Sequence, residues 1–237
     1  MKETRIVKYE IESVPSFENV EFTESSGSRL TVPQAFKFAR DHNSTLQSLR
    51  EAMAVRIDAK GADHADDWQW TRTGAIYVPE GKKVYVAFDD SFMEDLAQRG
   101  YDAHAAGKPF LLSAKDKPIA QAIERARDTK RFVEVAKQGD LEIALSKFGT
   151  HEVAVAAAQD MAAPYASHLK SQERTKGHIW LLKPELAEGK VEVRPVGLGN
   201  DICDNDVYAV INFYGNGQAR GVRSAQKNIS SCRNNAD

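Results

Sequence analysis

The sequence predicts an α+β fold in which β-rich terminal segments flank a largely helical middle. Residues 1–24 and 177–229 contain short apolar or alternating runs that are typical of strands. Residues 31–106 and 116–171 instead carry helix-start signals and apolar residues at spacings of three and four. No internal repeat divides the 237 residues. We therefore expect one domain with a helical insertion, whose terminal strands meet in one sheet; two separate domains are the alternative.

The chain opens with strand signals. Residues 4–14 alternate polar and apolar side chains up to Pro15, which predicts an opening strand, and residues 19–22 form a second short strand.

Three helix starts then carry a capping box, in which a hydroxyl caps one backbone N–H and a Gln or Glu side chain caps another. The three boxes are Thr31-x-x-Gln34, Ser44-x-x-Gln47 and Ser91-x-x-Glu94. The helices that they predict cover residues 32–42, 45–60 and 91–106.

Between the second and third of these helices lie two β-prone runs, residues 74–78 and 83–88, joined by Pro79-Glu80-Gly81. Turn residues between two apolar runs favour a hairpin. The later elements follow from similar signals. The further strands are predicted at 108–113, 178–182, 190–196, 207–214 and 219–224. The further helices are predicted at 116–137, 140–148 and 151–171, the last of them kinked at Pro164.

Composition indicates an ordinary soluble globular protein, because apolar residues make up 42% and charged residues 28% of the chain. The net charge of −2 provides no general attraction to nucleic acid or to anionic membranes. The charged N-terminus and the lack of a run of about 18 apolar residues predict a cytoplasmic protein without membrane association. We expect Cys203 and Cys232 to remain reduced thiols there.

No motif predicts catalysis, a metal or a cofactor. His151-Glu152 resembles the start of a zinc-protease helix, but Val155 stands where the second histidine is required. Several acidic clusters could hold a hard cation weakly or serve as acid–base pairs, although solvated loops and helix caps are the favoured explanation. These clusters are Asp63, His64, Asp66 and Asp67; Asp89 and Asp90; and Asp201, Asp204 and Asp206.

The segment 207–223, VYAVINFYGNGQARGVR, has the glycines of a phosphate-binding loop. Such a loop must lead into a helix N-terminus, and the residues that follow lack a helical face. Asn216-Gly217 between β-prone flanks instead predicts a type I′ hairpin turn.

Residues 207–236 contain no acidic side chain. Exposed aromatic rings and basic side chains together are typical of surfaces that bind single-stranded nucleic acid. The candidates here are Tyr208, Tyr214, Arg220, Arg223 and Lys227, with Trp180 as a weaker one. An ordinary edge hairpin explains the same residues.

Residues 200–229 resemble the C-terminal end of bacteriophage single-stranded-DNA-binding proteins of the OB-fold type. The resemblance lies in Asn212-Phe213-Tyr214, the following Gly215-Asn216-Gly217, Arg220-Gly221-Val222 and Asn228-Ile229. Weaker similarities lie in residues 4–22 and 109–126. The resemblance implies an OB-like antiparallel sheet or barrel that binds single-stranded DNA without sequence preference during replication or recombination. Arg220, Arg223 and Lys227 would then contact phosphates, and Tyr208, Tyr214 and Trp180 would stack on bases.

Two other functions fit the residues. A protein-interaction or assembly factor could dock through the predicted helices 116–137 and 151–171, and such a protein could also form a homo-oligomer. A small metal-assisted enzyme could use one of the aspartate clusters.

Overall fold

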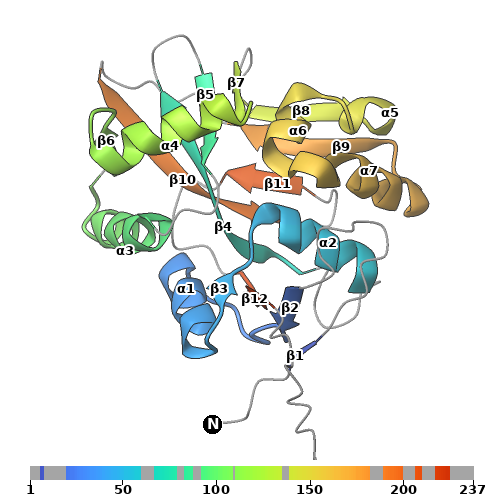
Figure 1. Cartoon of the computed structure of the whole chain (residues 1–237), viewed down its shortest axis with the longest axis horizontal. Coiled ribbons are helices and arrows are strands. Elements are labelled where there is room, and N and C mark those ends of the chain that lie inside the picture. Colours follow the sequence, from blue (N-terminus) through green and yellow to red (C-terminus); the bar gives the residue numbers. More distant parts are fainter. Residues whose placement is uncertain are drawn as a thin grey trace, which may run out of the picture.

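Two sheets surrounded by helices make up the protein, which confirms the α+β class (Figure 1). The structure is a computed structural model. It describes residues 6–7, 20–59, 67–78, 83–87, 92–108, 110–134, 139–181, 189–199, 206–209 and 217–224.

The main sheet has eight strands, and seven of them follow the order β7-β5-β4-β10-β11-β9-β8. The eighth strand, β6, pairs with the beginning of β10. The longest pair of the sheet, β4 with β10, is antiparallel, whereas β11 and β9 are parallel. The strands are β4 (Gln69–Val78), β5 (Lys83–Ala87), β6 (Leu111–Ser113), β7 (Phe132–Glu134), β8 (Gly139–Ala144), β9 (Lys176–Leu181), β10 (Lys190–Leu198) and β11 (Asp206–Ala209).

The second sheet joins the two ends of the chain. Its order is β1-β2-β12-β3, and its strands are β1 (Ile6–Val7), β2 (Val20–Thr23), β12 (Gly221–Ser224) and β3 (Thr45–Leu46). Val222 of β12 lies opposite Phe22 of β2, so the expectation that terminal strands meet in one sheet is confirmed. The main sheet, however, takes most of its strands from segments between these ends.

The helices are α1 (Val32–Asp41), α2 (Leu49–Ala59), α3 (Phe92–Ala105), α4 (Lys117–Asp128), α5 (Leu145–Phe148), α6 (Glu152–Ala158), the short 3₁₀ helix η2 (Gln159–Met161) and α7 (Ala162–Ser171). The helices predicted at 32–42 and 91–106 and the β4–β5 hairpin pairing are confirmed. In the part of the chain that the structure describes, no helix is long and apolar enough to span a membrane.

The second predicted helix begins later than expected. Residues 45–46 form β3, and the capping box of α2 is Ser48 with Glu51 rather than Ser44 with Gln47. The Ser48 N–H donates to the Glu51 carboxylate at 2.6 Å, and the Glu51 N–H donates to Ser48 Oγ at 3.2 Å.

Three other helix predictions need correction. Residues 140–144 belong to β8, because pairing with β9 outweighs the helix propensity of this segment. The helix that starts after Asp116 ends at Asp128, ahead of β7. The segment 151–171 is interrupted at Gln159, where φ is 56°. The predicted kink does not occur at Pro164, because this residue lies in the first turn of α7, where its missing N–H breaks no helical hydrogen bond.

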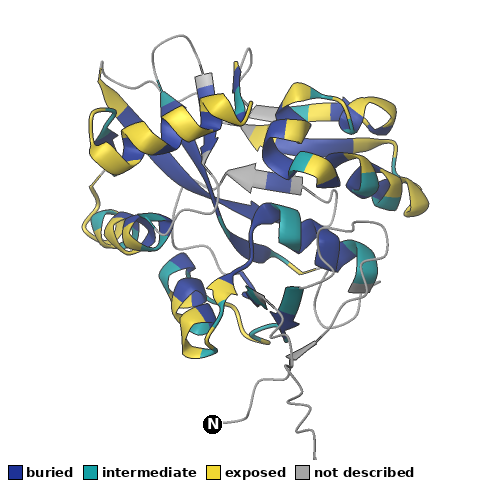
Figure 2. Cartoon of the chain, in the orientation of Figure 1, coloured by how far each residue is buried: buried dark blue, intermediate teal, exposed yellow. Residues whose placement is uncertain are grey.

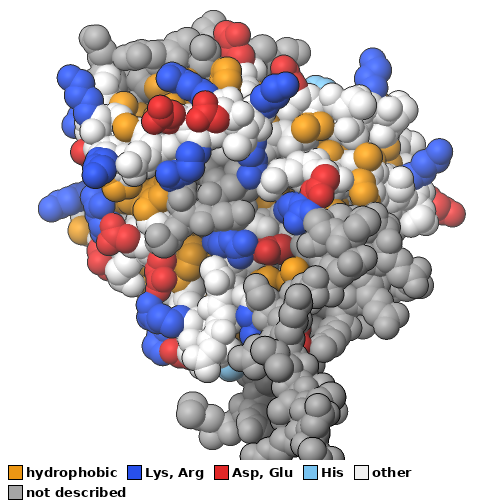
Figure 3. Space-filling model, in the orientation of Figure 1, with side chains coloured by type: hydrophobic (Ala, Val, Ile, Leu, Met, Phe, Trp, Pro, Cys, Tyr) orange, Lys and Arg blue, Asp and Glu red, His pale blue; other side chains and the backbone are white. Residues whose placement is uncertain are grey.

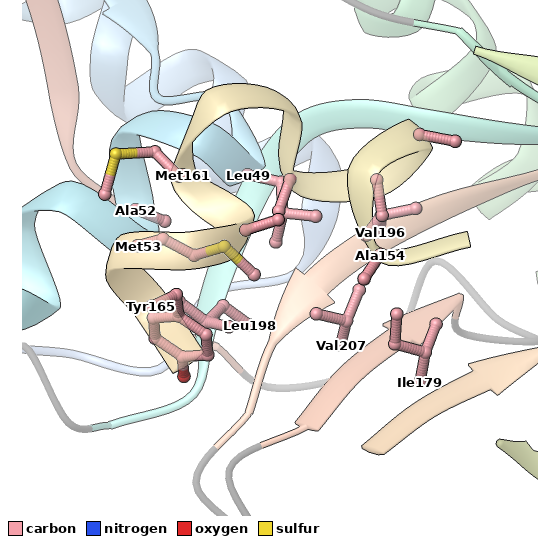
Figure 4. Close-up of a cluster of buried hydrophobic side chains, with 14 of the residues drawn as sticks. Leu49, Ala52, Met53, Ala154, Met161, Tyr165, Ile179, Val196, Leu198 and Val207 are labelled. Carbon is pink, nitrogen blue, oxygen red and sulfur yellow. The ribbon is translucent and has the colours of Figure 1, made fainter. Parts of the chain in front are cut away.

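The core consists of two apolar clusters, one on each side of the main sheet. The first cluster lies under α2, α6 and α7, and Figure 4 shows side chains of these helices packed against Ile179, Val196 and Val207 of three neighbouring strands. The second lies under α1, α3 and α4, around Trp70, Ile76 and Val193. Figure 2 shows the buried strands at the centre and the exposed outer sides of the helices.

Candidate binding face

Two of the predicted DNA contacts hold the fold together instead. Arg220 is fully buried, and its Nη1 donates to the backbone oxygen of Thr23 at 2.8 Å. Arg223 is partly buried, and its Nε donates to the Glu21 carboxylate at 3.0 Å across the β12–β2 pair. The prediction that Arg220 contacts phosphate is therefore wrong, since its guanidinium does not reach the surface.

The other predicted contacts are described incompletely. Tyr214 and Lys227 lie outside the described residues. The backbone of Tyr208 is part of β11, but its side chain is not described. Trp180 lies on β9 with 38% of its surface exposed.

Residues 217–220 form a buried connector between the two sheets. Gly217 and Leu30 exchange both backbone hydrogen bonds, at 2.8 and 3.0 Å. Gln218 donates to Trp68 O at 2.7 Å and accepts from Trp70 N at 2.9 Å. A Cβ at position 217 would lie 2.4 Å from Trp68 Cδ1, so the close approach of the Trp68 ring requires glycine at this position. The predicted hairpin is wrong, because its two strands, β11 and β12, lie in different sheets.

Buried polar side chains fix the chain at one end of the main sheet. The guanidinium of Arg56, fully buried, donates to three backbone oxygens, those of Asp67 at 3.0 Å, Leu198 at 3.3 Å and Gly199 at 2.7 Å. The Gln218 side chain accepts from Ser25 Oγ at 2.9 Å. These bonds satisfy groups that would otherwise be costly to bury, and they tie α2 to the start of β4 and the end of β10.

The strands β8 and β9 have one covered face and one outward face. On the covered face, Ile179 is buried, and a Cβ at Gly177 would lie 2.6 Å from the Phe148 ring of α5. Figure 1 shows α5, α6 and α7 gathered at this part of the sheet. Because side chains alternate along a strand, Trp180 points to the opposite side. We call this side of β8, β9 and β11 the outer face. Its described side chains are Glu142, Ala144, Lys176 and Trp180, which are exposed, and His178, which is buried.

Strand register places aromatic residues in one row across the outer face. Trp180 pairs with Tyr208 of β11, which in turn pairs with Gly197 of β10. Gly197 leaves room for the Trp68 ring, whose Cζ2 would lie 2.7 Å from a Cβ at that position. On the other side, Trp180 pairs with Asp140 of β8. The row thus runs from Trp68 to an acidic position.

The next row is dominated by ionisable residues. His178 pairs with Glu142 of β8 and with Asp206 of β11. Lys176 Nζ forms an ion pair with the Glu142 carboxylate. The hydrogen bond from Lys176 and its charge, with a smaller contribution from His178, hold the pKa of Glu142 below its ordinary value. Glu142 therefore stays ionised over the whole physiological range.

Other parts of the surface offer weaker sites. A groove of about 570 Å³ lies between α1 and α3, but its charged side chains already have partners. Arg40 pairs with Glu94 across the groove, Lys37 pairs with Asp41, and Asp95 pairs with Arg99. Figure 3 shows basic and acidic side chains interspersed over α1, α3 and α4 rather than separated into patches.

The predicted metal and catalytic residues do not form a described site. Among the described residues, no three His, Cys, Asp or Glu side chains come together as metal ligands. Asp67 is exposed, and its carboxylate accepts from Gln218 Nε2 at 3.3 Å. His151 caps α6, with Nδ1 accepting from Val153 N at 3.3 Å. The residues outside the described part are Asp63, His64, Asp66, Asp89, Asp90, Asp201, Cys203, Asp204 and Cys232, and the side chain of Asp206 is also not described.

Sequence reasoning missed Trp68 and Glu142. The apolar positions Leu141 and Ile143 alternate with Glu142 and Ala144, and this period of two could have identified β8. No local signal places Trp68 beside Gly197 and Gly217, because those contacts join distant segments.

Comparison with known proteins yields one informative similarity. No family model and no curated protein matches the chain. A solved structure, described as accommodation of massive sequence variation in Nanoarchaeota by the C-type lectin fold, is similar with a TM-score of 0.58. The match covers 87% of this chain and 98% of the other at 12% sequence identity. At this identity the match indicates the fold alone, that of a C-type lectin.

This finding overturns the resemblance to bacteriophage single-stranded-DNA-binding proteins. The similar structure has a C-type lectin fold rather than an OB fold, so the predicted binding of single-stranded DNA and the predicted role in phage replication or recombination are wrong. The resemblance rested on about 30 residues, part of which form the buried connector, and a short β-prone segment of this kind can occur in unrelated folds.

Proposed function

We propose that this chain is a binding protein in which a C-type lectin framework presents the outer face of β8, β9 and β11 to a partner protein. The observation that carries the proposal is Trp180, which exposes 38% of its surface on a sheet face opposite the one that packs under α5 and α7. Aromatic residues exposed on rigid elements are common anchors of protein interfaces.

The framework supports this role because the outer face is separate from the core. The buried contacts of Arg56, Gln218 and Gly217 fix α2, the start of β4 and the end of β10, and they use no side chain of the outer face. The similar structure is described as accommodating massive sequence variation. By analogy, side chains on the outer face can change without disturbing the residues that define the fold. The proposal keeps the sequence-based hypothesis of a protein-interaction factor. It places the docking surface on the sheet, however, where the sequence had suggested the predicted helices 116–137 and 151–171.

Site-specific photo-crosslinking tests this proposal. A photoreactive amino acid is placed at position 180, or at the control positions Val155 and Leu111, which are similarly exposed at 39% and 41%. Each protein is then irradiated in extract from its source cells. We expect a discrete adduct at position 180 that excess unmodified protein competes away. Adducts of equal yield at all three positions, or none at position 180, would contradict the proposal.

A further inference from the structure

We propose that a cavity inside the first apolar cluster is a binding site for one small nonpolar molecule. The cavity lies between the main sheet and the helices α2 and α6, and about 20 Å³ of it is free. Its lining residues are all apolar, and they include Leu49, Val84, Val153, Ala157, Val196 and Val207. Figure 4 shows three of them, Leu49 on α2, Val196 on β10 and Val207 on β11.

The chemistry of the lining selects a nonpolar guest. A buried water molecule needs two to four polar partners, and no polar side chain lines this cavity. The backbone groups of β4, β5 and β10 pair with one another in the main sheet. A polar guest would therefore give up its hydrogen bonds to water and gain none in return. An apolar cavity of this kind stays dry and accepts guests such as xenon.

The size of the cavity limits the guest to a few atoms. A single water molecule needs about 10–15 Å³ of such free volume, so 20 Å³ holds one guest of similar size. The side chains around it are closely packed, and a larger guest would have to displace them. We therefore expect the site to accept an atom the size of xenon and to reject larger hydrocarbons.

Small side chains explain why this space is left open. Ala75 on β4 and Ala157 on α6 both line the cavity, and both are buried. A longer side chain at either position would extend into the free volume. Ile179 and Val207 also line the cavity and directly precede Trp180 and Tyr208 in β9 and β11. The cavity thus lies behind strands of the outer face, but its binding of a guest does not depend on the proposed function.

Methyl NMR of the full chain under xenon pressure tests the proposal. We expect saturable chemical-shift changes at the methyl groups of Val84, Val196 and Val207, and none at Val191 of the second apolar cluster. Methanol should cause no saturable change, because its hydroxyl group would be buried without a partner. Cyclohexane should cause none either, because it is too large. The proposal would be overturned by saturable changes with methanol, by equal changes in both clusters, or by no saturable change with xenon.

Two matched substitutions locate the site. Ala157→Val fills the cavity and should abolish the xenon response. Ala122→Val makes the same change at a buried alanine of the second cluster and should keep the full response. A folded Ala157→Val protein that still responds to xenon would contradict the proposal. If Ala157→Val does not fold, Val207→Ile adds a single methyl group to the same lining and is interpreted in the same way.

A third substitution tests the size limit. Val86→Ala enlarges the cavity and should allow cyclohexane to bind. If guests bound only to this variant and xenon did not bind to the unaltered chain, the cavity would be a packing void and the proposal would fail. Crosslinking at position 180 reports separately on the proposed function, so either proposal can fail without the other.

Discussion

At the residue scale, two arginines three positions apart have different environments. Arg220 is fully buried and bonded to Thr23 O, whereas the Arg223 side chain is 39% exposed beside Glu21. We expect Arg220→Ala to lower the free energy of unfolding by about 3 kcal/mol or more, because it leaves a cavity and an unsatisfied carbonyl. Arg223→Ala should cost less than about 1 kcal/mol, as partly exposed ion pairs do. Urea denaturation of both variants measures the difference.

The comparison distinguishes a structural arginine from a binding arginine. If Arg220→Ala were as stable as Arg223→Ala, the buried position of Arg220 would be contradicted. Arg220→Lys provides a second check. Lysine keeps the charge but lacks the guanidinium fork, so it should recover only part of the lost stability.

A second residue-scale prediction concerns pH. Arg50 donates hydrogen bonds to both carboxylate oxygens of Asp160, from Nε to one oxygen and from Nη2 to the other at 2.6 Å. Hydrogen bonding to Arg50 lowers the pKa of Asp160 from its ordinary 3.8. The contribution to stability is therefore present above the ordinary pKa and is lost as pH falls through the lower folded value. Since 51% of the Asp160 side chain is exposed, we expect the ion pair to contribute less than about 1 kcal/mol to the free energy of unfolding.

A double-mutant cycle with Arg50→Ala and Asp160→Asn isolates this contribution. The coupling energy from urea denaturation should be favourable at pH 7 and should decline as the pH is lowered and the carboxylate takes up its proton. A coupling that does not decline with falling pH would rule out an ion pair as its source.

At the element scale, the start of α2 depends on the Ser48–Glu51 capping box. Ser48→Ala should cost about 1 kcal/mol by leaving an end N–H of the helix without its side-chain acceptor. Glu51→Ala should cost more, because Glu51 also pairs with Arg72 at 3.0 Å and both side chains are largely buried. Ser167→Ala, an exposed change within α7, is the control and should be nearly neutral. Thermal unfolding followed by circular dichroism ranks the three, and a different order would place the helix start elsewhere.

Elements with strong local signals could be predicted from the sequence, and those that depend on distant partners could not. The capping box at Thr31 and Gln34 and the apolar runs of β4 and β5 are local, and the predicted elements are present. The segment of β8 was predicted as a helix although Leu141 and Ile143 alternate with Glu142 and Ala144, and its pairing with the distant strand β9 leaves no local signal. The connector at Gly217 was predicted as a turn for the same reason, since the tryptophan rings that require glycine are about 150 positions away in the chain.

At the scale of the whole molecule, the candidate site could be predicted only in part. Trp180 was selected from the sequence as an aromatic contact, but for a different class of ligand. The outer face itself depends on three strands, β8, β9 and β11, that are adjacent in space and separated in sequence. The neighbours of Trp180 and His178 on β8 are set by the strand register, which pairs Trp180 with Asp140 and His178 with Glu142. Such a surface forms only when the chain folds, so no continuous stretch of sequence reveals it.

The whole molecule should unfold as one unit, because the first apolar cluster takes side chains from both sheets. Phe22 of the small sheet, fully buried, belongs to the same cluster as Val196 and Val207 of the main sheet. Phe22→Ala should therefore lower the free energy of unfolding by about 3–5 kcal/mol while the transition remains a single step. Tryptophan fluorescence reports on Trp70 and Trp180 in the main sheet and on Trp68 next to it, and it should coincide with far-UV circular dichroism throughout. If the two signals separated and the main sheet survived the loss of the small one, the chain would consist of two independently folding domains.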